Sequence, residues 1–312
     1  MNPAPEITVV IPVYNSGARM LDEAYAALAP VLSGLSAEIL FVDDGSGAET
    51  LEALHRLHAR DARVRVVELM TNFGQHAAFS AGFDNARGRY LITMDADLQA
   101  DPQDIPKLIA PLREGYDLVG GVRLHRQDPL FRRVSSWMVT RIVAMMTGVR
   151  LRDVGCPFNA LTSEVARSVS TFGELRRFLK PLAVRVAQRV TEVEVSHRSR
   201  PGYQRRSSYS ATGLIRLFMD FFVNSLGDVF AWVFVAATSI SVVLVVATIV
   251  ALGAWAAGRG TAAVLLVSSG LALQAALVAL FALAGDYVQR IYRQSGGRPF
   301  YLVRRVLERE AR

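Results

Sequence analysis

Two carboxylates one residue apart, Asp95 and Asp97, directly follow an apolar segment at residues 90–94. Side chains alternate between the two faces of a strand, so both carboxylates can converge where that strand leaves its sheet. With the amide oxygen of Gln99 they form an oxygen donor set that suits Mg²⁺ or Mn²⁺ and leaves room for water and substrate phosphates. A cation held there could act as a Lewis acid and stabilise the charge on a departing diphosphate. The chemistry indicated is metal-dependent transfer from a nucleotide-activated sugar.

Two further polar clusters follow other apolar segments. Pro12, Tyr14 and Asn15 come at the end of the first segment, and Asp43 and Asp44 at the end of the second. Ligands of open parallel sheets bind beyond the carboxyl ends of the strands, so clusters at three strand ends would face one crevice. A carboxylate there could accept hydrogen bonds from a base or a ribose. The serine that follows the two aspartates could equally cap a helix.

The elements that must position these clusters form a repeating pattern. Between residues 7 and 122, short β-branched runs alternate with helical patterns, which is typical of an α/β fold with a Rossmann-like, mainly parallel sheet. We predict strands at 7–13, 38–43, 64–69, 90–94, 117–122 and 190–197. We predict helices at 20–32, 48–60, 75–86 and 102–114. A further helical pattern at 131–147 could belong to the core or contact lipid.

The charge of the chain indicates an anionic partner. The formal net charge is +7, and 51% of the 312 residues are hydrophobic. Arginines gather at 123–152, 198–216 and 290–312, and the last two stretches flank the most apolar part of the chain. That placement favours phospholipid head groups over nucleic acid, whose single-strand binders interleave basic residues with exposed aromatics. The single cysteine, Cys156, cannot form an internal disulfide, which fits a reducing compartment.

Two apolar runs near the C-terminus predict a membrane hairpin. Residues 229–257 and 261–285 contain no charged side chain, and each exceeds the roughly 20 residues that cross a bilayer. Residues 211–228 resemble an amphipathic helix in the membrane interface. The excess of arginine after the second run predicts a cytoplasmic catalytic domain at 1–210 and a basic cytoplasmic tail at 286–312, in a multi-pass protein of the inner membrane. The alternative is a buried hairpin of a soluble protein.

Five motifs together resemble a known family. They are Pro12-Val13-Tyr14-Asn15, Val42-Asp43-Asp44-Gly45-Ser46, Asn72-Phe73-Gly74-Gln75-His76, Ala81-Gly82-Phe83 and Met94-Asp95-Ala96-Asp97-Leu98-Gln99. These are similar to motifs of the inverting family 2 glycosyltransferases that load sugars onto polyprenyl phosphates, and the similarity covers nearly the whole chain. It implies a GT-A domain with a metal at Asp95, Asp97 and Gln99. It implies a nucleotide site at Pro12, Tyr14, Asn15, Asp43, Asp44, Gln75 and Asp95.

The resemblance also implies that arginines near the membrane hold the phosphate of the acceptor. The candidates for this role are Arg132, Arg133, Arg200, Arg205, Arg206 and Ser207. Three positions depart from the family pattern, because Ser16 stands where Glu is common, Asn159 where Arg is usual, and Ser208 where Lys is common. The absence of positively charged side chains at Asn159 and Ser208 should weaken phosphate binding unless neighbouring arginines compensate.

The acidity of the acceptor suggests a mechanism. A phosphate monoester is largely dianionic at neutral pH, so it can attack the anomeric carbon without a base and invert it. We therefore expect transfer from a nucleotide-diphosphate sugar, with UDP favoured, to a polyprenyl phosphate such as undecaprenyl phosphate. The candidate catalytic residues are Asp95, Asp97 and Asp153, and for Asp153 a structural or sugar-orienting role ranks ahead of a base.

Three other functions compete with this hypothesis. One is a processive polysaccharide synthase, although the Gln-x-x-Arg-Trp motif of those enzymes does not occur in this sequence. Another is a transferase that acts on a hydroxyl-bearing membrane lipid and needs a base. The third is a non-catalytic membrane protein that binds nucleotide sugars. The sequence identifies neither the sugar nor the number of subunits, and a homo-oligomer is compatible with it.

Overall fold

The structure is a computed structural model. It describes residues 4–123, 148–170, 172, 179–197 and 299–308, together with isolated helical positions between 140 and 144 and between 270 and 291. The chain divides into two compact units, one made of residues 1–210 with 299–312 and the other of residues 211–298. The first unit contains the motifs, and the account below concerns that unit unless the other is named.

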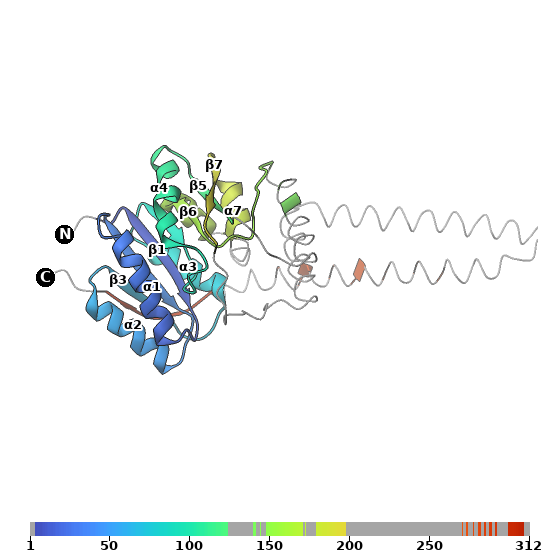
Figure 1. The fold of residues 1–312 in the computed structure, drawn as a ribbon. Helices are drawn as coiled ribbons and strands as arrows, with labels where there is room; N and C mark the ends of the chain where they lie inside the picture. Colours follow the sequence, from blue (N-terminus) through green and yellow to red (C-terminus); the bar gives the residue numbers. More distant parts are fainter. Residues whose placement is uncertain are drawn as a thin grey trace, which may run out of the picture. The chain divides into compact units, whose positions relative to one another are not determined.

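An eight-stranded sheet forms the centre of the first unit, in the order β7-β5-β6-β4-β1-β2-β3-β8 (Figure 1). The strands are β1 Ile7–Val13, β2 Ala37–Asp43, β3 Val64–Leu69, β4 Tyr90–Thr93, β5 Leu118–Arg123, β6 Asn159–Thr162, β7 Val190–Val195 and β8 Val303–Leu307. The pairs β1–β2, β1–β4, β2–β3 and β5–β7 are parallel. Strands β6 and β8 run antiparallel to their neighbours. The predicted α/β class with a mainly parallel sheet is confirmed.

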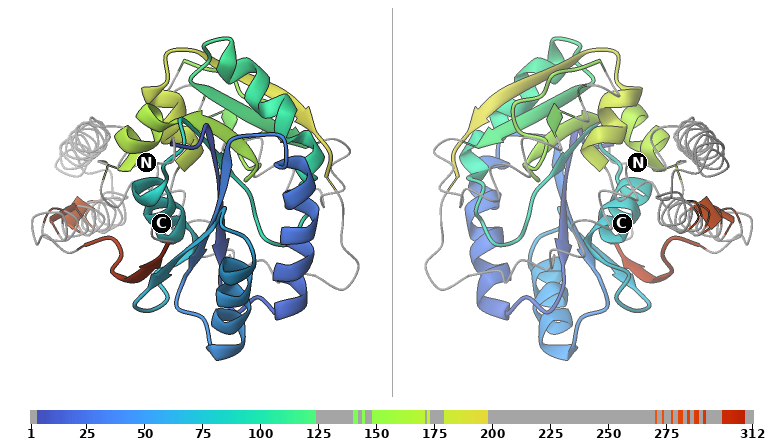
Figure 2. Two further views of the ribbon diagram at one scale, coloured as in Figure 1. Left: turned by 90° about the vertical axis from the view of Figure 1, so that its left-hand side faces the viewer. Right: turned by 90° about the vertical axis from the view of Figure 1, so that its right-hand side faces the viewer.

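Helices cover both faces of this sheet (Figure 2). Helices α1 Ala18–Val31, α2 Ala48–Arg60 and α4 Ile105–Arg113 pack on one face, with the 3₁₀ turn η1 Pro102–Asp104 leading into α4. Helices α3 Gln75–Asn85, α6 Ser163–Ser170 and α7 Leu179–Val186 pack on the other. Because both faces are covered, the inner strands are apolar along almost their whole length.

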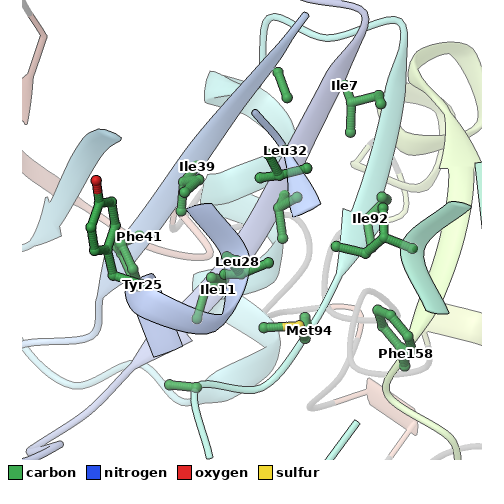
Figure 3. Close-up of a cluster of buried hydrophobic side chains, with 14 of the residues drawn as sticks. Ile7, Ile11, Tyr25, Leu28, Leu32, Ile39, Phe41, Ile92, Met94 and Phe158 are labelled. Atoms are coloured by element: carbon green, nitrogen blue, oxygen red, sulfur yellow. The ribbon is translucent and has the colours of Figure 1, made fainter. Parts of the chain in front are cut away.

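Strand β1 contributes side chains to two hydrophobic cores, one on each face of the sheet. Ile7, Val9 and Ile11 point to the face covered by α1 and α2, and Val10 points to the face covered by α3. Figure 3 shows Ile11 beside Leu28 of α1 in the first of these cores. Packing on both faces fixes the register of β1, and therefore fixes where its carboxyl end delivers the residues that follow.

Several elements were predicted with the observed bounds, and others were missed. The bounds of β1, β3 and α2 agree with the prediction. Strand β6 and helices α6 and α7 were not predicted. Residues 286–312 were expected to form a basic tail, with no strand predicted there; residues 303–307 form β8 beside β3. Two arginines in this strand interrupt the apolar alternation that usually reveals one.

The predicted membrane segments lie largely outside the described residues. This applies to 211–228, to 229–257 and to the first part of 261–285. Among the residues that the structure does describe, no helix has both the length and the apolar content needed to cross a bilayer. The positions described between 270 and 291 are helical, and the large apolar side chains of Leu277, Phe281 and Val288 are exposed there.

Candidate active site

A pocket of about 340 Å³ opens beyond the carboxyl ends of β1, β2 and β4. It is lined by Pro12, Val13, Tyr14, Asn15, Ser16, Met20, Asp44, Asn72, Gly74, Gln75, Asp95, Ala96 and Asp97. This is the edge at which open parallel sheets bind their ligands. Each of the three polar clusters of the sequence therefore contributes residues to one crevice, although Asp43 and Gln99 do not line it.

Asp95 and Asp97 both lie on the wall of this pocket. Asp95 Oδ1 accepts a hydrogen bond of 2.7 Å from Gln75 Nε2, which orients this carboxylate from α3. Asp97 Oδ1 accepts one of 3.1 Å from the backbone N–H of Gln99. Leu98, between Asp97 and Gln99, has a φ of 56°. This left-handed conformation is uncommon for leucine, and it closes the turn from Asp97 to Gln99. This strained residue directly follows Asp97 of the pocket, and strained backbone is often found at functional sites.

The donor set fits a divalent metal ion in chemical type. Two carboxylates on one wall are hard oxygen ligands of the kind that Mg²⁺ and Mn²⁺ take, with substrate oxygens and water completing the shell. No group of three or more acidic, histidine or cysteine side chains that could hold a metal occurs in the described part of the chain. Gln99 does not line the pocket, so its predicted role as a third ligand stays a prediction.

Asp44 holds one side of the pocket in place. Its side chain is only 2% exposed, and its two oxygens accept hydrogen bonds of 2.8 Å each from the backbone N–H groups of Phe73 and Gly74. Burial raises the pKa of Asp44, although these two bonds oppose that rise. Asp43 is also buried, which raises its pKa, but it bonds to Ser46 N–H within its own turn and does not line the pocket. The predicted nucleotide contact therefore fits Asp44 better than Asp43.

Asn15 links the first strand end to the second. It adopts a φ of 47°, its N–H donates to Ser46 Oγ at 2.9 Å, and its Oδ1 accepts from Gly47 N–H at 3.0 Å. Its neighbour Tyr14 is left 53% exposed at the pocket. Asn15 thus shapes the turn, and Tyr14 offers an aromatic face on which a nucleotide base could stack.

Asp153 lies in a different environment from the pocket carboxylates. It is 3% exposed and forms a two-pronged ion pair with Arg123, at 2.7 Å from Nε and 2.9 Å from Nη2. It does not line the pocket. This arrangement favours the structural role over that of a general base.

Asn159 is buried in β6, where its Nδ2 donates to the carbonyl of Cys156 at 2.8 Å. It therefore offers no surface contact for a phosphate. The predicted acceptor residues Arg132, Arg133, Arg200, Arg205, Arg206 and Ser207 lie outside the described residues.

The pocket also includes residues that were not predicted. Asn72 and Gly74 line it, and the motif around Phe73 contains both, so that motif held the signal. Met20 lines it from the first turn of α1, and no sequence pattern distinguished this methionine from the core residues of the helix. Gln75 was predicted to contact the nucleotide, and the structure adds its bond to Asp95.

Comparison with known proteins shows the class of enzyme to which this fold belongs. Residues 8–167 match the family described as glycosyl transferase family 2. The chain is 34% identical to undecaprenyl-phosphate 4-deoxy-4-formamido-L-arabinose transferase of Yersinia enterocolitica, covering 98% of this chain and 94% of that relative. It is 35% identical to the transferase of the same name from Salmonella paratyphi A, covering 99% and 96%.

A solved structure supports the fold. It is the glucosyl-3-phosphoglycerate synthase of Mycobacterium tuberculosis in complex with Mn²⁺ and UDP-glucose, with a TM-score of 0.50 and 17% identity over 72% of this chain and 79% of that one. The GT-A-like fold expected from the motifs is thereby confirmed. The chain belongs to glycosyl transferase family 2, and it is a glycosyltransferase.

Proposed function

We propose that this enzyme moves a sugar from a nucleoside diphosphate, with UDP favoured, to undecaprenyl phosphate or a similar polyprenyl phosphate. The observation that carries the proposal is that one pocket brings together Tyr14, Asp44 and the carboxylates Asp95 and Asp97. A base-binding aromatic, a buried acid and two metal-type ligands are what a sugar donor with a diphosphate requires. Relatives named for transfer involving undecaprenyl phosphate match nearly the whole chain, which supports the lipid acceptor.

The donor would extend along the pocket from its base to its diphosphate. Tyr14 would stack on the base, and Asp44 would present the 72–75 loop to the nucleoside. Asp95 and Asp97 would hold Mg²⁺ or Mn²⁺, which neutralises charge on the departing diphosphate when bound. Gln75 would keep Asp95 oriented through its 2.7 Å bond. The Mn²⁺ and UDP-glucose in the complex of the structural neighbour support this choice of ligands.

The acceptor phosphate would attack the anomeric carbon directly and invert it. At neutral pH it is largely dianionic and needs no base. The ion pair of Asp153 with Arg123 supports a reaction without Asp153 as base. Arg132, Arg133, Arg200, Arg205, Arg206 and Ser207 are the proposed phosphate contacts.

We place the enzyme at the cytoplasmic face of the inner membrane. The uncharged runs at 229–257 and 261–285 support a two-helix anchor. The exposed apolar side chains of Leu277, Phe281 and Val288 on a helix support contact with lipid, because such side chains are costly in water.

The test uses the full chain in detergent, with a panel of UDP- and GDP-sugars, undecaprenyl phosphate and Mg²⁺ or Mn²⁺. Mass spectrometry should detect a lipid that carries the sugar on its phosphate. Asp95→Asn and Asp97→Asn should each lower turnover by about 10²- to 10³-fold, the usual cost of losing a group that stabilises transition-state charge. Asp22→Asn, on the exposed side of α1, is the matched control and should leave turnover unchanged.

Two outcomes would overturn the proposal. Near-normal turnover of Asp97→Asn would reject the metal site. Transfer to a hydroxyl-bearing lipid but not to undecaprenyl phosphate would reject the acceptor.

A further inference from the structure

Residues 299–308 return to the sheet after the second unit and end as its edge strand. Strand β8 lies antiparallel beside β3 (the dark red strand in Figures 1 and 2). Just beyond β3, both polar backbone atoms of Met70 bond to this segment. The Met70 N–H donates to the carbonyl of Leu302 at 2.8 Å, and the Met70 carbonyl accepts from Arg304 Nη2 at 3.1 Å.

A bulge in the strand explains how Arg304 reaches that carbonyl. The register pairs Glu68 with Arg305 but Leu69 with Val303, so Arg304 has no partner residue on β3. A β-bulge of this kind re-aims a side chain, and bulges are frequent next to active sites. Here the extra residue sends its guanidinium to the first residue after β3.

Met70 begins the loop that forms one wall of the pocket. Asn72, Gly74 and Gln75 line the pocket, and the amides of Phe73 and Gly74 bond to Asp44. The loop from 70 to 75 is therefore fixed at its far end by Asp44 and at its near end by β8. The segment that contains β8 thus contacts one end of the 70–75 loop, and other residues of the same loop line the donor pocket.

Strand β8 is itself firmly attached to the first unit. Arg305 Nε donates to Glu68 Oε2 at 2.9 Å, and His55 Nε2 lies 2.7 Å from Glu68 Oε1. Burial alone would raise the pKa of Glu68, but the hydrogen bonds from Arg305 and His55 outweigh it and hold this pKa below its usual range. Arg87 pairs with Glu308 at the other end of the strand. The pair of Arg305 with Glu68 stands next to the bulge, so it is this end of the strand that acts as a fixed support for the loop.

We infer that β8 is a positioning element of the donor pocket, and that Arg304 is the positioning residue that holds Met70 and the loop behind it. The identity of the ligand rests on the function proposed above, whereas the support of the loop does not. The donor pocket would consequently be incomplete without residues that follow the apolar runs in the chain, although the lining residues in the described part of the chain all precede those runs.

The experiment compares Arg304→Ala, Arg304→Lys and Arg87→Ala in the full chain. Arg87→Ala is the matched control, because it removes another arginine contact of the same strand, at Glu308 rather than at Met70. Hydrogen exchange is first measured without ligand. Arg304→Ala should speed exchange of the Phe73 and Gly74 amides by about three- to tenfold, the equivalent of one lost hydrogen bond, and Arg87→Ala should not.

Steady-state kinetics then separate a loss of nucleotide-sugar binding, which changes KM, from a general destabilisation of the protein. In Arg304→Ala the KM for the nucleotide sugar should rise by about three- to tenfold with kcat within about twofold, because the loss falls on binding and not on chemistry. Arg304→Lys should restore part of the change, since lysine keeps a charged donor.

Unchanged exchange in Arg304→Ala, or equal effects of Arg304→Ala and Arg87→Ala, would overturn the inference. A wild-type enzyme that transfers no sugar would overturn the proposed function instead and would leave the exchange result in force. The two failures can thus be told apart.

Discussion

Two loop regions beside the carboxyl ends of the strands are stabilised in different ways. The donor loops, residues 43–47 and 70–75, are held mainly by backbone groups, with Asp44 accepting two amides and Gly45 lying against the backbone of Thr71. The loop at 151–158 is held by buried charges. Asp153 pairs with Arg123, and Lys180 Nζ donates to the carbonyl of Asp153 from α7.

The charge cluster around the 151–158 loop spans four segments of the chain. Burial lowers the pKa of Lys180, whose ammonium also lies 3.9 Å from Glu192 on β7. The loop contacts the end of β4 through Thr93, which stands two residues before Asp95. The hydroxyl of Thr93 donates a hydrogen bond to the carbonyl of Pro157 at 2.6 Å. The donor loops are thus held by hydrogen bonds to backbone groups, whereas the 151–158 loop is held by buried ion pairs.

The largest effect should follow from breaking the buried ion pair. Arg123→Met leaves the Asp153 carboxylate buried without its cation, and the free energy of unfolding should fall by about 3–5 kcal/mol. The double variant Arg123→Met with Asp153→Asn removes both charges and should recover at least about 1 kcal/mol of that loss. Urea denaturation of the single and double variants measures both values.

The same variants decide the role of Asp153. If it is structural, the double variant should transfer sugar within about tenfold of the wild type per folded molecule. A general base would cost about 10²- to 10⁴-fold in every variant that lacks the carboxylate. If the stability loss of the double variant equalled the sum of the losses of Arg123→Met and Asp153→Asn, the two residues would not form a coupled pair.

A smaller effect should follow from adding one methyl group to the donor loops. Gly45 has a φ of 73°, and a Cβ there would lie 2.5 Å from the carbonyl carbon of Thr71. Gly45→Ala should therefore destabilise the protein by about 2–4 kcal/mol, through backbone strain and overpacking together. Gly74→Ala meets open space, so only strain remains; its φ of 96° and ψ of 157° lie in a region that essentially only glycine adopts, and about 1–3 kcal/mol is expected.

Gly34→Ala is the control for this series, because nothing lies within 4 Å of its added Cβ. Its effect should stay within about 0.5 kcal/mol. Nucleotide affinity should fall in the order of the stability losses, which thermal unfolding and UDP titration would measure. If Gly45→Ala bound UDP as the wild type does, the donor loops would not depend on this backbone contact.

Three residues of the pocket could be found from the sequence because the signals that mark them are local. Tyr14, Asp44 and Asp95 each follow a strand whose apolar run is unmistakable, and each stands in a short motif. Asp43 was grouped with Asp44, although adjacent side chains at the end of a strand point in different directions. Only the structure shows that Asp43 bonds within its own turn and that Asp44 lines the pocket.

The other side depends on partners that no local pattern reveals. Arg123 and Asp153 are thirty positions apart. Strand β6 has four residues and pairs antiparallel with β4 and β5, so its existence depends on neighbours and not on its own periodicity. Strand β8 pairs with a strand more than two hundred positions earlier, and its two arginines suggested a tail.

The smallest effect should come from a partly exposed local ion pair just before β3 begins, at the edge of the sheet opposite the pocket. Asp61 follows α2 and accepts hydrogen bonds from Arg63 and from the hydroxyl of Tyr25, at 2.8 Å and 2.9 Å. The bond from Arg63 is the main cause that lowers the pKa of Asp61 from 3.8 to about 2. A carboxyl with a lowered folded pKa adds stability above its unfolded pKa and loses it as the pH falls.

Asp61→Asn should therefore cost about 1–2 kcal/mol at pH 7, after allowance for the partial exposure of the pair. The difference from the wild type should shrink between the two pKa values of 3.8 and about 2 and vanish below them. Urea denaturation at pH 7, 4 and 2.5 measures this, with Asp22→Asn as an exposed control. A loss that equalled that of Arg123→Met would show that a partly exposed local ion pair stabilises the fold as much as the buried pair does.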